Sequence, residues 1–256
     1  MIGKPRVTTE DCLFSGALHL RQPARGHRAG TDAVLLAAAC PGDARRVVDL
    51  GCGVGTVGLR VAQAVPASQI ALVDVDPAIL ALASGNIALN GLGDRVRCVS
   101  GDCTTVTFPA SDTGLAGWAD MVVTNPPFFD SGRGQVSPVA LKARAHGFEA
   151  DQQNALDAWI KGALRCLAPR GEIVLIHRAD ALSVLLAALD RRFGNIRLRF
   201  VQARADAPAI RVLVRATLAS RAPLQVLPPL VLNDAEGTFT PHSAAIHAGT
   251  ATLDWA

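Results

Sequence analysis

The stretch VVDLGCGVGTVGLRVA, residues 47–62, decides how the chain folds. It begins apolar and β-branched, turns glycine-rich and ends with helical apolar spacing, so it predicts a strand, a tight turn and a helix. Gly51, Gly53 and Gly55 let the turn form and let a ligand approach the backbone without a Cβ in the way. The helix start offers unpaired N–H groups that favour anionic or carboxylate atoms. Such a turn alone does not exclude a dinucleotide-binding unit.

Apolar strands and helices alternate along the chain around this stretch. The alternation predicts an α/β fold with a mostly parallel sheet covered on both faces. Strands are expected at residues 46–50, 70–75, 95–100, 121–125 and 172–177, and helices at 56–65, 77–89, 151–167 and 179–192. Residues 196–205 and 209–218 are β-rich and joined by a short turn, which predicts an antiparallel pair at one edge of the sheet.

The remaining segments divide the chain into three parts. Residues 1–45 hold β-like pieces and a helix at 31–39, with Thr31 or Asp32 as its N-cap, and are expected to pack on a central domain at 46–220. Residues 221–256 are rich in Pro, Gly, Thr and Ser, and we expect an extended tail of the same domain with modest structure.

Composition excludes several protein classes. Half of the 256 residues are hydrophobic, yet no segment approaches the roughly 18–20 apolar residues of a membrane span, and residues 1–13 lack the apolar core of a secretory signal. We therefore expect a cytoplasmic protein without a membrane partner. The six cysteines and six histidines show no metal-ligand spacing, so we expect buried structural cysteines and no metal site. A net charge of +3 does not by itself require a nucleic-acid partner.

Three aspartates follow or end successive predicted strands. Asp49 precedes the glycines, where its carboxylate suits a positively charged group such as an amino acid ammonium. Asp74 can accept hydrogen bonds from both hydroxyls of a ribose, while Asp76 can cap the next helix. Asp102 can accept from an adenine amino group. Each aspartate alone is equally a cap or turn residue, but the ordered set describes S-adenosylmethionine.

The motifs DLGCGVG, VDVDP, GDC and NPPF stand in the order usual for class I S-adenosylmethionine-dependent methyltransferases, which this chain resembles between Val47 and Phe129. The resemblance implies a Rossmann-like fold with a seven-stranded sheet and a C-terminal antiparallel hairpin. It also implies that Asp49 and the glycines hold the methionine part of the cofactor, Asp74 the ribose and Asp102 the adenine.

The corner TNPPFFD, residues 124–130, suggests the chemistry. Pro126 and Pro127 have no N–H, so the corner offers carbonyl acceptors, and Asn125 adds a side-chain oxygen. Such acceptors would hold an amino group and aim its lone pair at the methyl donor, while Phe128 would stack on a planar ring. The alternative is a simple strand-ending turn. The motif resembles that of amino-group methyltransferases.

The segment GHRAGTDAVLLAA, residues 26–38, before the glycine turn resembles the bacterial family that methylates the exocyclic amine of an adenine in the anticodon loop of a valine tRNA. In that family the glycine–threonine–aspartate lies beside the cofactor, so Thr31 and Asp32 would form one wall of the site. Residues 142–163 also resemble that family's basic loop and following helix, although the tail after Leu230 has no recognisable match. Guanine in ribosomal RNA, a protein glutamine, or a non-catalytic RNA-binding role stay open. The short N-terminal segment disfavours the release-factor glutamine enzymes.

Basic residues flank the predicted site. A base must be turned outward to reach such a pocket, and phosphate contacts would guide it there. We expect the RNA approach to be lined by Arg21, Arg25, Arg28, Lys142 and Arg144. A later cluster, Arg191, Arg192, Arg197 and Arg199, has the simpler interpretation of a solvated face.

Overall fold

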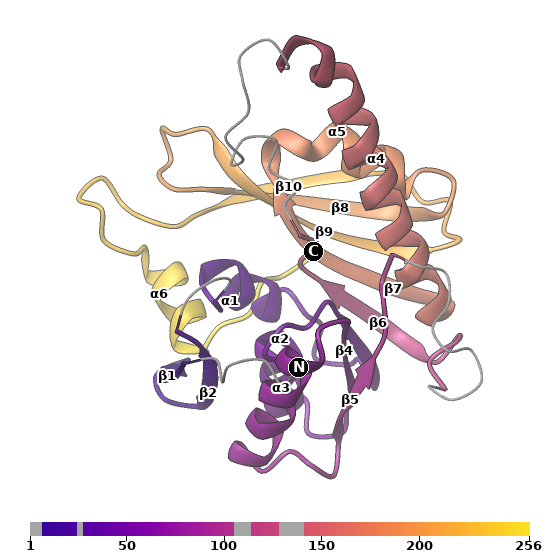
Figure 1. Cartoon of the computed structure of the whole chain (residues 1–256). Helices are drawn as coiled ribbons and strands as arrows, with labels where there is room; N and C mark the ends of the chain where they lie inside the picture. Colours follow the sequence, from indigo (N-terminus) through magenta and orange to yellow (C-terminus); the bar gives the residue numbers. More distant parts are fainter. Residues whose placement is uncertain (1–6, 25–27, 105–113, 128–140) are drawn as a thin grey trace.

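An eight-stranded sheet runs through the molecule in the order β10-β8-β9-β7-β6-β3-β4-β5 (Figure 1). The structure is a computed structural model that describes residues 7–24, 28–104, 114–127 and 141–256. The strands are β3 (Arg46–Leu50), β4 (Gln69–Asp74), β5 (Val96–Ser100), β6 (Ala119–Thr124), β7 (Leu167–Arg178), β8 (Phe193–Gln202), β9 (Ala209–Leu218) and β10 (Gln225–Val231). Strands β3 to β7 pair in parallel, β9 runs antiparallel to β7 and β8, and β10 is parallel to β8.

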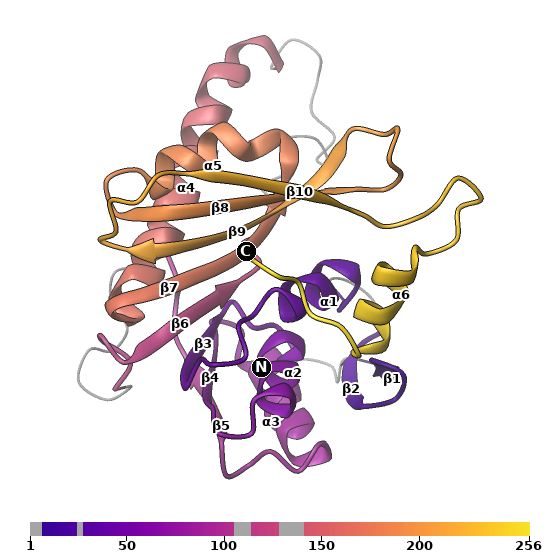
Figure 2. The same cartoon turned by 180° about the vertical axis from the view of Figure 1, so that it is seen from behind.

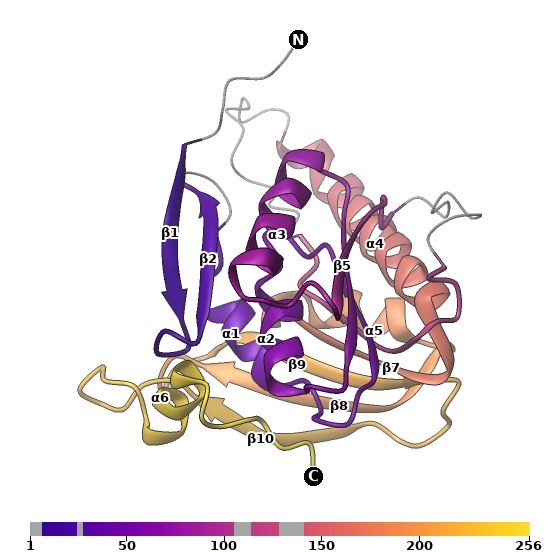
Figure 3. The same ribbon diagram turned by 90° about the horizontal axis from the view of Figure 1, so that it is seen from below.

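Helices cover both faces of the sheet. On one side lie α1 (Thr31–Ala38), α2 (Thr56–Ala64) and α3 (Pro77–Leu89), and on the other lie α4 (Leu141–Cys166) and α5 (Leu182–Leu189) (Figure 3). A short 3₁₀ turn, Ala179–Ala181, leads into α5, and α6 (Pro241–Ala248) packs against α1. This confirms the expected Rossmann-like architecture, in which right-handed crossovers place helices on both faces of a parallel sheet.

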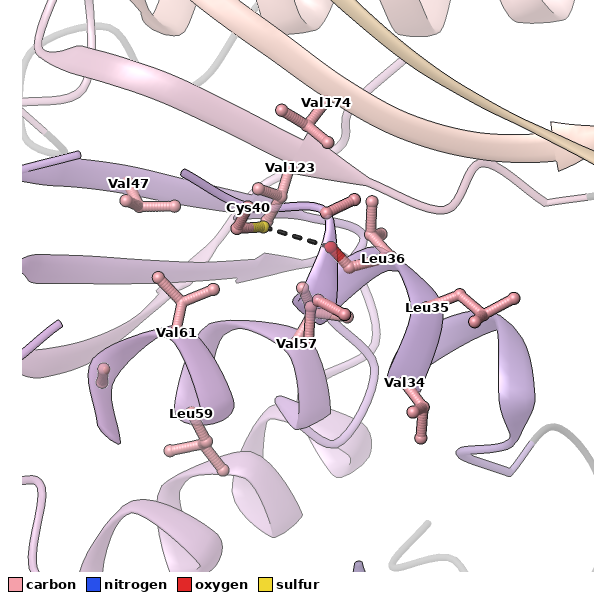
Figure 4. Close-up of a cluster of buried hydrophobic side chains, with 14 of the residues drawn as sticks. Val34, Leu35, Leu36, Cys40, Val47, Val57, Leu59, Val61, Val123 and Val174 are labelled. Atoms are coloured by element: carbon pink, nitrogen blue, oxygen red, sulfur yellow. Dashed lines mark hydrogen bonds between the residues drawn. The ribbon is translucent and has the colours of Figure 1, made fainter. Parts of the chain in front are cut away.

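Alternation along the strands divides the buried side chains into two cores. Val47 and Val123 belong to the core beneath α1 and α2, while their neighbours Val48 and Val122 belong to the core beneath α4 and α5. Figure 4 shows part of the first core, where side chains of α1 and α2 meet those of the central strands. Because both faces are buried, the strands are almost continuously apolar, which made them easy to recognise.

Most predicted elements agree with the structure to within a residue or two, and the larger differences have local causes. Helix α4 begins at Leu141, ten residues before the expected start, because residues 141–150 are too polar to show an apolar period. The N-cap of α1 is Gly30, with no side-chain cap bond, so the expected Thr31 or Asp32 cap is wrong.

The cysteines are structural, as expected, with two exceptions. All six thiols are free, and four are buried: Cys40, Cys52, Cys103 and Cys166. Burial raises the thiol pKa of Cys103 and of Cys166 to about 12, so these groups stay protonated near neutral pH. Cys12 is exposed and Cys98 is half-buried.

The N-terminal β-like stretch is a hairpin of its own. Strands β1 (Thr8–Leu13) and β2 (Leu18–Pro23) form a two-stranded antiparallel sheet. It lies beside α3, well away from the main sheet's β10 edge (Figure 3). None of the helices in the described ranges is both long and apolar enough to cross a membrane.

The C-terminal segment has more structure than an extended tail. Besides β10, which makes the sheet eight-stranded where seven strands were expected, it contains α6 and a buried terminus. The terminus passes from α6 alongside α1 (Figure 2). There Trp255 Nε1 donates to the carbonyl of Ala39 at 2.7 Å, and the Leu253 N–H donates to the carbonyl of Ala38 at 2.8 Å. These bonds satisfy carbonyls that the end of a helix leaves unpaired.

Two arginines of the later basic cluster hold this terminus. Arg197 Nη1 donates to the carbonyl of Trp255 at 2.9 Å, and Arg199 Nη2 donates to the carbonyl of Asp254 at 2.5 Å. For these two residues the expected solvated face is wrong, because both side chains are bound to the protein's own backbone.

Replacing Trp255 by alanine should destabilise the fold strongly. Trp255 is 4% exposed, and removing a buried tryptophan typically costs about 3–5 kcal/mol. Urea unfolding measures the change. Phe239→Ala serves as the control because Phe239 is 43% exposed and stacks only on His247, so its loss should cost less than about 1.5 kcal/mol. Equal effects of the two variants would mean that the terminus is loosely attached.

Candidate cofactor and catalytic site

The predicted site residues meet at the carboxyl edge of the parallel strands. Asp49 lies within β3, Asp74 ends β4, and Asn125 follows β6 directly. Strand β3 pairs with both β4 and β6, so Asp49 stands beside Leu72 on one side and Val123 on the other. Asp102 comes two residues after the end of β5, next to β4. In open α/β sheets this edge is where ligands bind.

Asp49 is the most deeply placed carboxylate. Its side chain is 3% exposed, and its Oδ2 accepts a hydrogen bond from the Gly58 N–H of α2 at 2.8 Å. Burial raises the pKa of Asp49 to about 7; the Gly58 N–H opposes this shift, and the nearby charge of Asp74 adds to it. A group with this pKa is half-ionised near neutral pH and can accept a cationic ligand by becoming fully ionised.

Gly58 allows the helix to come this close, and the sequence reasoning did not single it out. A Cβ at Gly58 would lie 2.4 Å from Leu72 Cδ2 and 3.2 Å from the Cβ of Asp49. The available signal was a fourth glycine inside a helical pattern, where glycine is otherwise unfavourable.

The glycine turn has the backbone shape predicted for it. Gly51, Gly53 and Gly55 have φ values of +73°, +55° and +90°, which favour glycine. A Cβ on Gly51 would lie 2.6 Å from Cζ2 of Trp159, so packing also demands glycine there. A Cβ on Gly53 would meet nothing within 4 Å, so this glycine borders open space where a ligand can approach.

Asp74 joins the glycine turn to β4. Its Oδ2 accepts from the Gly53 N–H at 3.0 Å, and its Oδ1 accepts from the Asp76 N–H at 3.0 Å. A carboxylate has about four lone-pair positions, so these bonds leave capacity for ligand hydroxyls. Asp76 caps α3 by accepting from the Ala78 N–H at 2.8 Å, as the sequence suggested.

Asp102 lies in a local turn. Its Oδ1 accepts from the backbone N–H of Thr104 at 2.8 Å and from the Thr104 hydroxyl at 2.7 Å. These bonds give Asp102 the turn role that was the alternative to cofactor binding for each of the three aspartates. It orients the carboxyl group beside the end of β5, and a contact with adenine stays a prediction.

Asn125 is placed by a hydrogen-bond chain that joins three elements. Thr124 Oγ1 donates to the carbonyl of Leu50 at 2.7 Å and accepts from Trp159 Nε1 of α4 at 2.8 Å. The side-chain oxygen of Asn125 is buried and receives no hydrogen bond from the described residues. A buried acceptor without a donor is costly, which fits a site that receives an amino group. Trp159 was not singled out from sequence.

The rest of the corner is described only in part. Pro126 is buried and Pro127 is exposed, while Phe128 lies outside the described residues, so its stacking role stays a prediction.

Thr31 and Asp32 begin α1, and Asp32 has a partner that the sequence did not reveal. Both of its carboxylate oxygens accept from Arg211 Nε of β9 at 3.0 Å. Thr31 is exposed. The ion pair fixes the start of α1 to the C-terminal half of the sheet, and the role of both residues as a wall of the cofactor site stays a prediction.

Of the five basic residues expected along the RNA approach, the structure describes the side chains of two, and both form ion pairs within the N-terminal segment. Arg28 Nη2 donates to both carboxylate oxygens of Asp11, at 2.9 and 2.8 Å, and Arg21 Nε donates to Glu10 at 2.8 Å. Arg25 and the side chains of Lys142 and Arg144 lie outside the described part of the chain.

Comparisons with known proteins place this site in a family. The model of the methyltransferase small domain matches residues 28–143. A tRNA1(Val) (adenine(37)-N6)-methyltransferase from Aeromonas hydrophila is 33% identical over 83% of this chain and 85% of that protein. The chain belongs to the family of this tRNA1(Val) (adenine(37)-N6)-methyltransferase. The expected family and enzyme class are thereby confirmed.

Two further similarities of this methyltransferase are informative. A release factor glutamine methyltransferase from Bordetella pertussis is 34% identical over 65% of this chain but 58% of that protein. The crystal structure of a predicted O-methyltransferase from Agrobacterium tumefaciens aligns with a TM-score of 0.71 at 24% identity, covering 87% of this chain and 98% of that one. The second similarity supports the fold alone.

Gly58→Ala should destabilise the methyltransferase by about 1–3 kcal/mol, because the added methyl overpacks the contact with Leu72. Gly85→Ala in α3 is the matched control: a Cβ there meets nothing within 4 Å, so the change should stabilise by about 0.5–1 kcal/mol. Denaturant unfolding of both variants gives the comparison. Changes in unfolding free energy of the same sign for the two variants would contradict close packing at Gly58.

The raised pKa of Asp49 makes stability depend on pH. Between the ordinary value of 3.8 and about 7, the unfolded chain has released a proton that the folded chain retains. Stability from this group is therefore fully present below about pH 4 and is lost as pH rises to about 7, by at most about 1.4 kcal/mol per unit. Unfolding free energies at pH 5, 6, 7 and 8 should fall more steeply for wild type than for Asp49→Asn, and parallel curves would contradict the raised pKa.

Proposed function

We propose that this protein methylates the exocyclic N6 amine of an adenine in the anticodon loop of a tRNA, with S-adenosylmethionine as methyl donor. The observation that carries the proposal is the buried Asn125 Oδ1 at the carboxyl edge of β6, an acceptor to which no described residue donates. The named activity of the relative from Aeromonas hydrophila supports adenine as the base. Because tRNA is the substrate, we place the protein in the cytoplasm.

Each carboxylate of the site would bind a different part of the cofactor. Bound there, S-adenosylmethionine would supply an electrophilic methyl group. Asp49, fixed by the Gly58 N–H, would face the ammonium of the methionine part, beside the glycine turn. Asp74 would accept from the ribose hydroxyls and Asp102 from the adenine amine.

Asn125 and Pro126 position the reacting amine. The amine has two N–H groups, of which Asn125 Oδ1 would accept one and the Pro126 carbonyl the other. Held in this way, the nitrogen lone pair is drawn out of conjugation with the ring and directed toward the methyl donor. Neither oxygen is basic enough to take a proton, so N6 loses its extra proton to water after transfer.

Glutamine in a release factor is the second candidate, favoured by the 34% identity to the enzyme from Bordetella pertussis. Its side-chain amide presents the same two N–H groups to Asn125. The similarity spans 58% of that enzyme, whereas the similarity to the tRNA enzyme from Aeromonas hydrophila spans 85% of the latter. We therefore rank this acceptor second.

Asn125→Ala should lower methyl transfer strongly, because the reacting amine loses one of its two acceptors, and it should affect turnover more than cofactor binding. Loss of one positioned polar group of this kind typically lowers turnover about 100- to 1,000-fold. The assay follows labelled methyl from S-adenosylmethionine into unmodified tRNA, ribosomal RNA and a release factor, with nucleoside analysis of the products.

Asn233→Ala is the matched control, because the Asn233 side chain donates to the carbonyl of Ala203 beyond β10, and this variant should keep wild-type turnover. Label in adenosine of tRNA is the expected result. Label in guanosine or in protein would show that the substrate is not adenine in tRNA. Cofactor binding without any labelled product would contradict the proposed activity.

A further inference from the structure

Asn86 of α3 and its C-cap residue Asn90 bond the backbone edge of β2 in the way that a neighbouring strand would. Asn86 Oδ1 accepts from the Arg21 N–H at 2.7 Å, and its Nδ2 donates to the Arg21 carbonyl at 3.0 Å. Asn90 makes the same pair of bonds to His19, at 3.0 and 2.7 Å. Four residues of helix rise roughly 6 Å and two residues of strand roughly 6.7 Å, so the two spacings match. The hairpin is therefore docked on α3 through its main chain.

Asn86 makes one bond that Asn90 does not. Its Nδ2 also donates to the carbonyl of Val54 at 3.0 Å, and Val54 is the residue between Gly53 and Gly55. The corresponding bond of Asn90 stays within its own helix, to the carbonyl of Asn86 at 2.8 Å. Asn86 is 0% exposed, so its amide has no water to replace a lost partner.

The bond from Asn86 fixes the orientation of a peptide group in the glycine turn. The peptide between Val54 and Gly55 is held at its carbonyl by Asn86 and at its N–H by the carbonyl of Cys52, at 2.9 Å. The preceding Gly53 N–H is held by Asp74. Because the glycines themselves impose few backbone restraints, these bonds determine which way the turn presents its groups.

We propose that Asn86 is a positioning residue that couples the seating of the β1–β2 hairpin to affinity for the cofactor. This inference rests on the proposed role of the glycine turn in binding S-adenosylmethionine. The hairpin then acts on the cofactor site through Asn86, whose amide is bonded to Arg21 of β2 and to Val54 of the glycine turn. By linkage, cofactor binding must also stabilise the docked hairpin by the same factor.

The test compares Asn86→Ala with Asn90→Ala. Both variants lose the two bonds to β2, but only Asn86→Ala loses the bond to Val54. Isothermal titration with S-adenosylmethionine should show about tenfold weaker binding for Asn86→Ala and less than about twofold for Asn90→Ala. In the tRNA assay the KM for the cofactor should rise in parallel while kcat changes less, a separation that general destabilisation does not produce.

Asn86→Asp tests the donor side of the amide by itself. It keeps an acceptor for the Arg21 N–H but turns an oxygen toward the carbonyls of both Arg21 and Val54, so its cofactor affinity should fall at least as far as that of Asn86→Ala. Thermal unfolding of each variant without cofactor reports the structural cost separately.

Hydrogen exchange tests the coupling in the wild-type protein, so no substitution can disturb its folding. Saturating S-adenosylmethionine should slow exchange of the Arg21 amide about tenfold. The Thr238 amide, bound to Asp234 in the turn after β10, should not change. Wild-type binding with equal affinities for Asn86→Ala and Asn90→Ala, or an unchanged Arg21 amide, would overturn this inference alone. Absence of cofactor binding by wild type would overturn the proposed function as well.

Discussion

The close approach of α2 to the sheet at Gly58 is the constraint on which the site depends. Only a residue without a side chain fits between α2 and Leu72, and only at this distance does the Gly58 N–H reach Asp49. The helix start is thereby held over the end of β3, and the glycine turn must close the short gap between them. A carboxylate kept in the interior with one N–H partner is then available to a cationic ligand.

A second contact places the catalytic corner relative to this turn. Thr124 bonds the carbonyl of Leu50 and Trp159 of α4, so the ends of β3 and β6 and one helix on the far face are fixed together. Trp159 also fills the space above Gly51. The cofactor turn and Asn125 therefore share one support, and their separation is set by packing across the sheet.

The ends of the chain complete the arrangement from outside. Trp255 closes the carboxyl end of α1, while Asp32 at its start is bound by Arg211 of β9. On the other side, Asn86 and Asn90 hold the N-terminal hairpin against α3. Segments far apart in sequence thus hold the helices that border the site.

Local sequence determined the order of strands and helices, the glycine turn and the aspartates at the strand ends, because apolar period, glycine and cap chemistry act over a few residues. It also indicated the acceptor corner at Asn125. Tertiary structure alone decided that Gly58 contacts Leu72, that Trp159 supports Thr124, that Arg211 pairs with Asp32, and that Pro228 and Pro229 stand within an eighth strand. Each of these contacts joins residues that are distant in sequence, so no local sequence pattern predicts it.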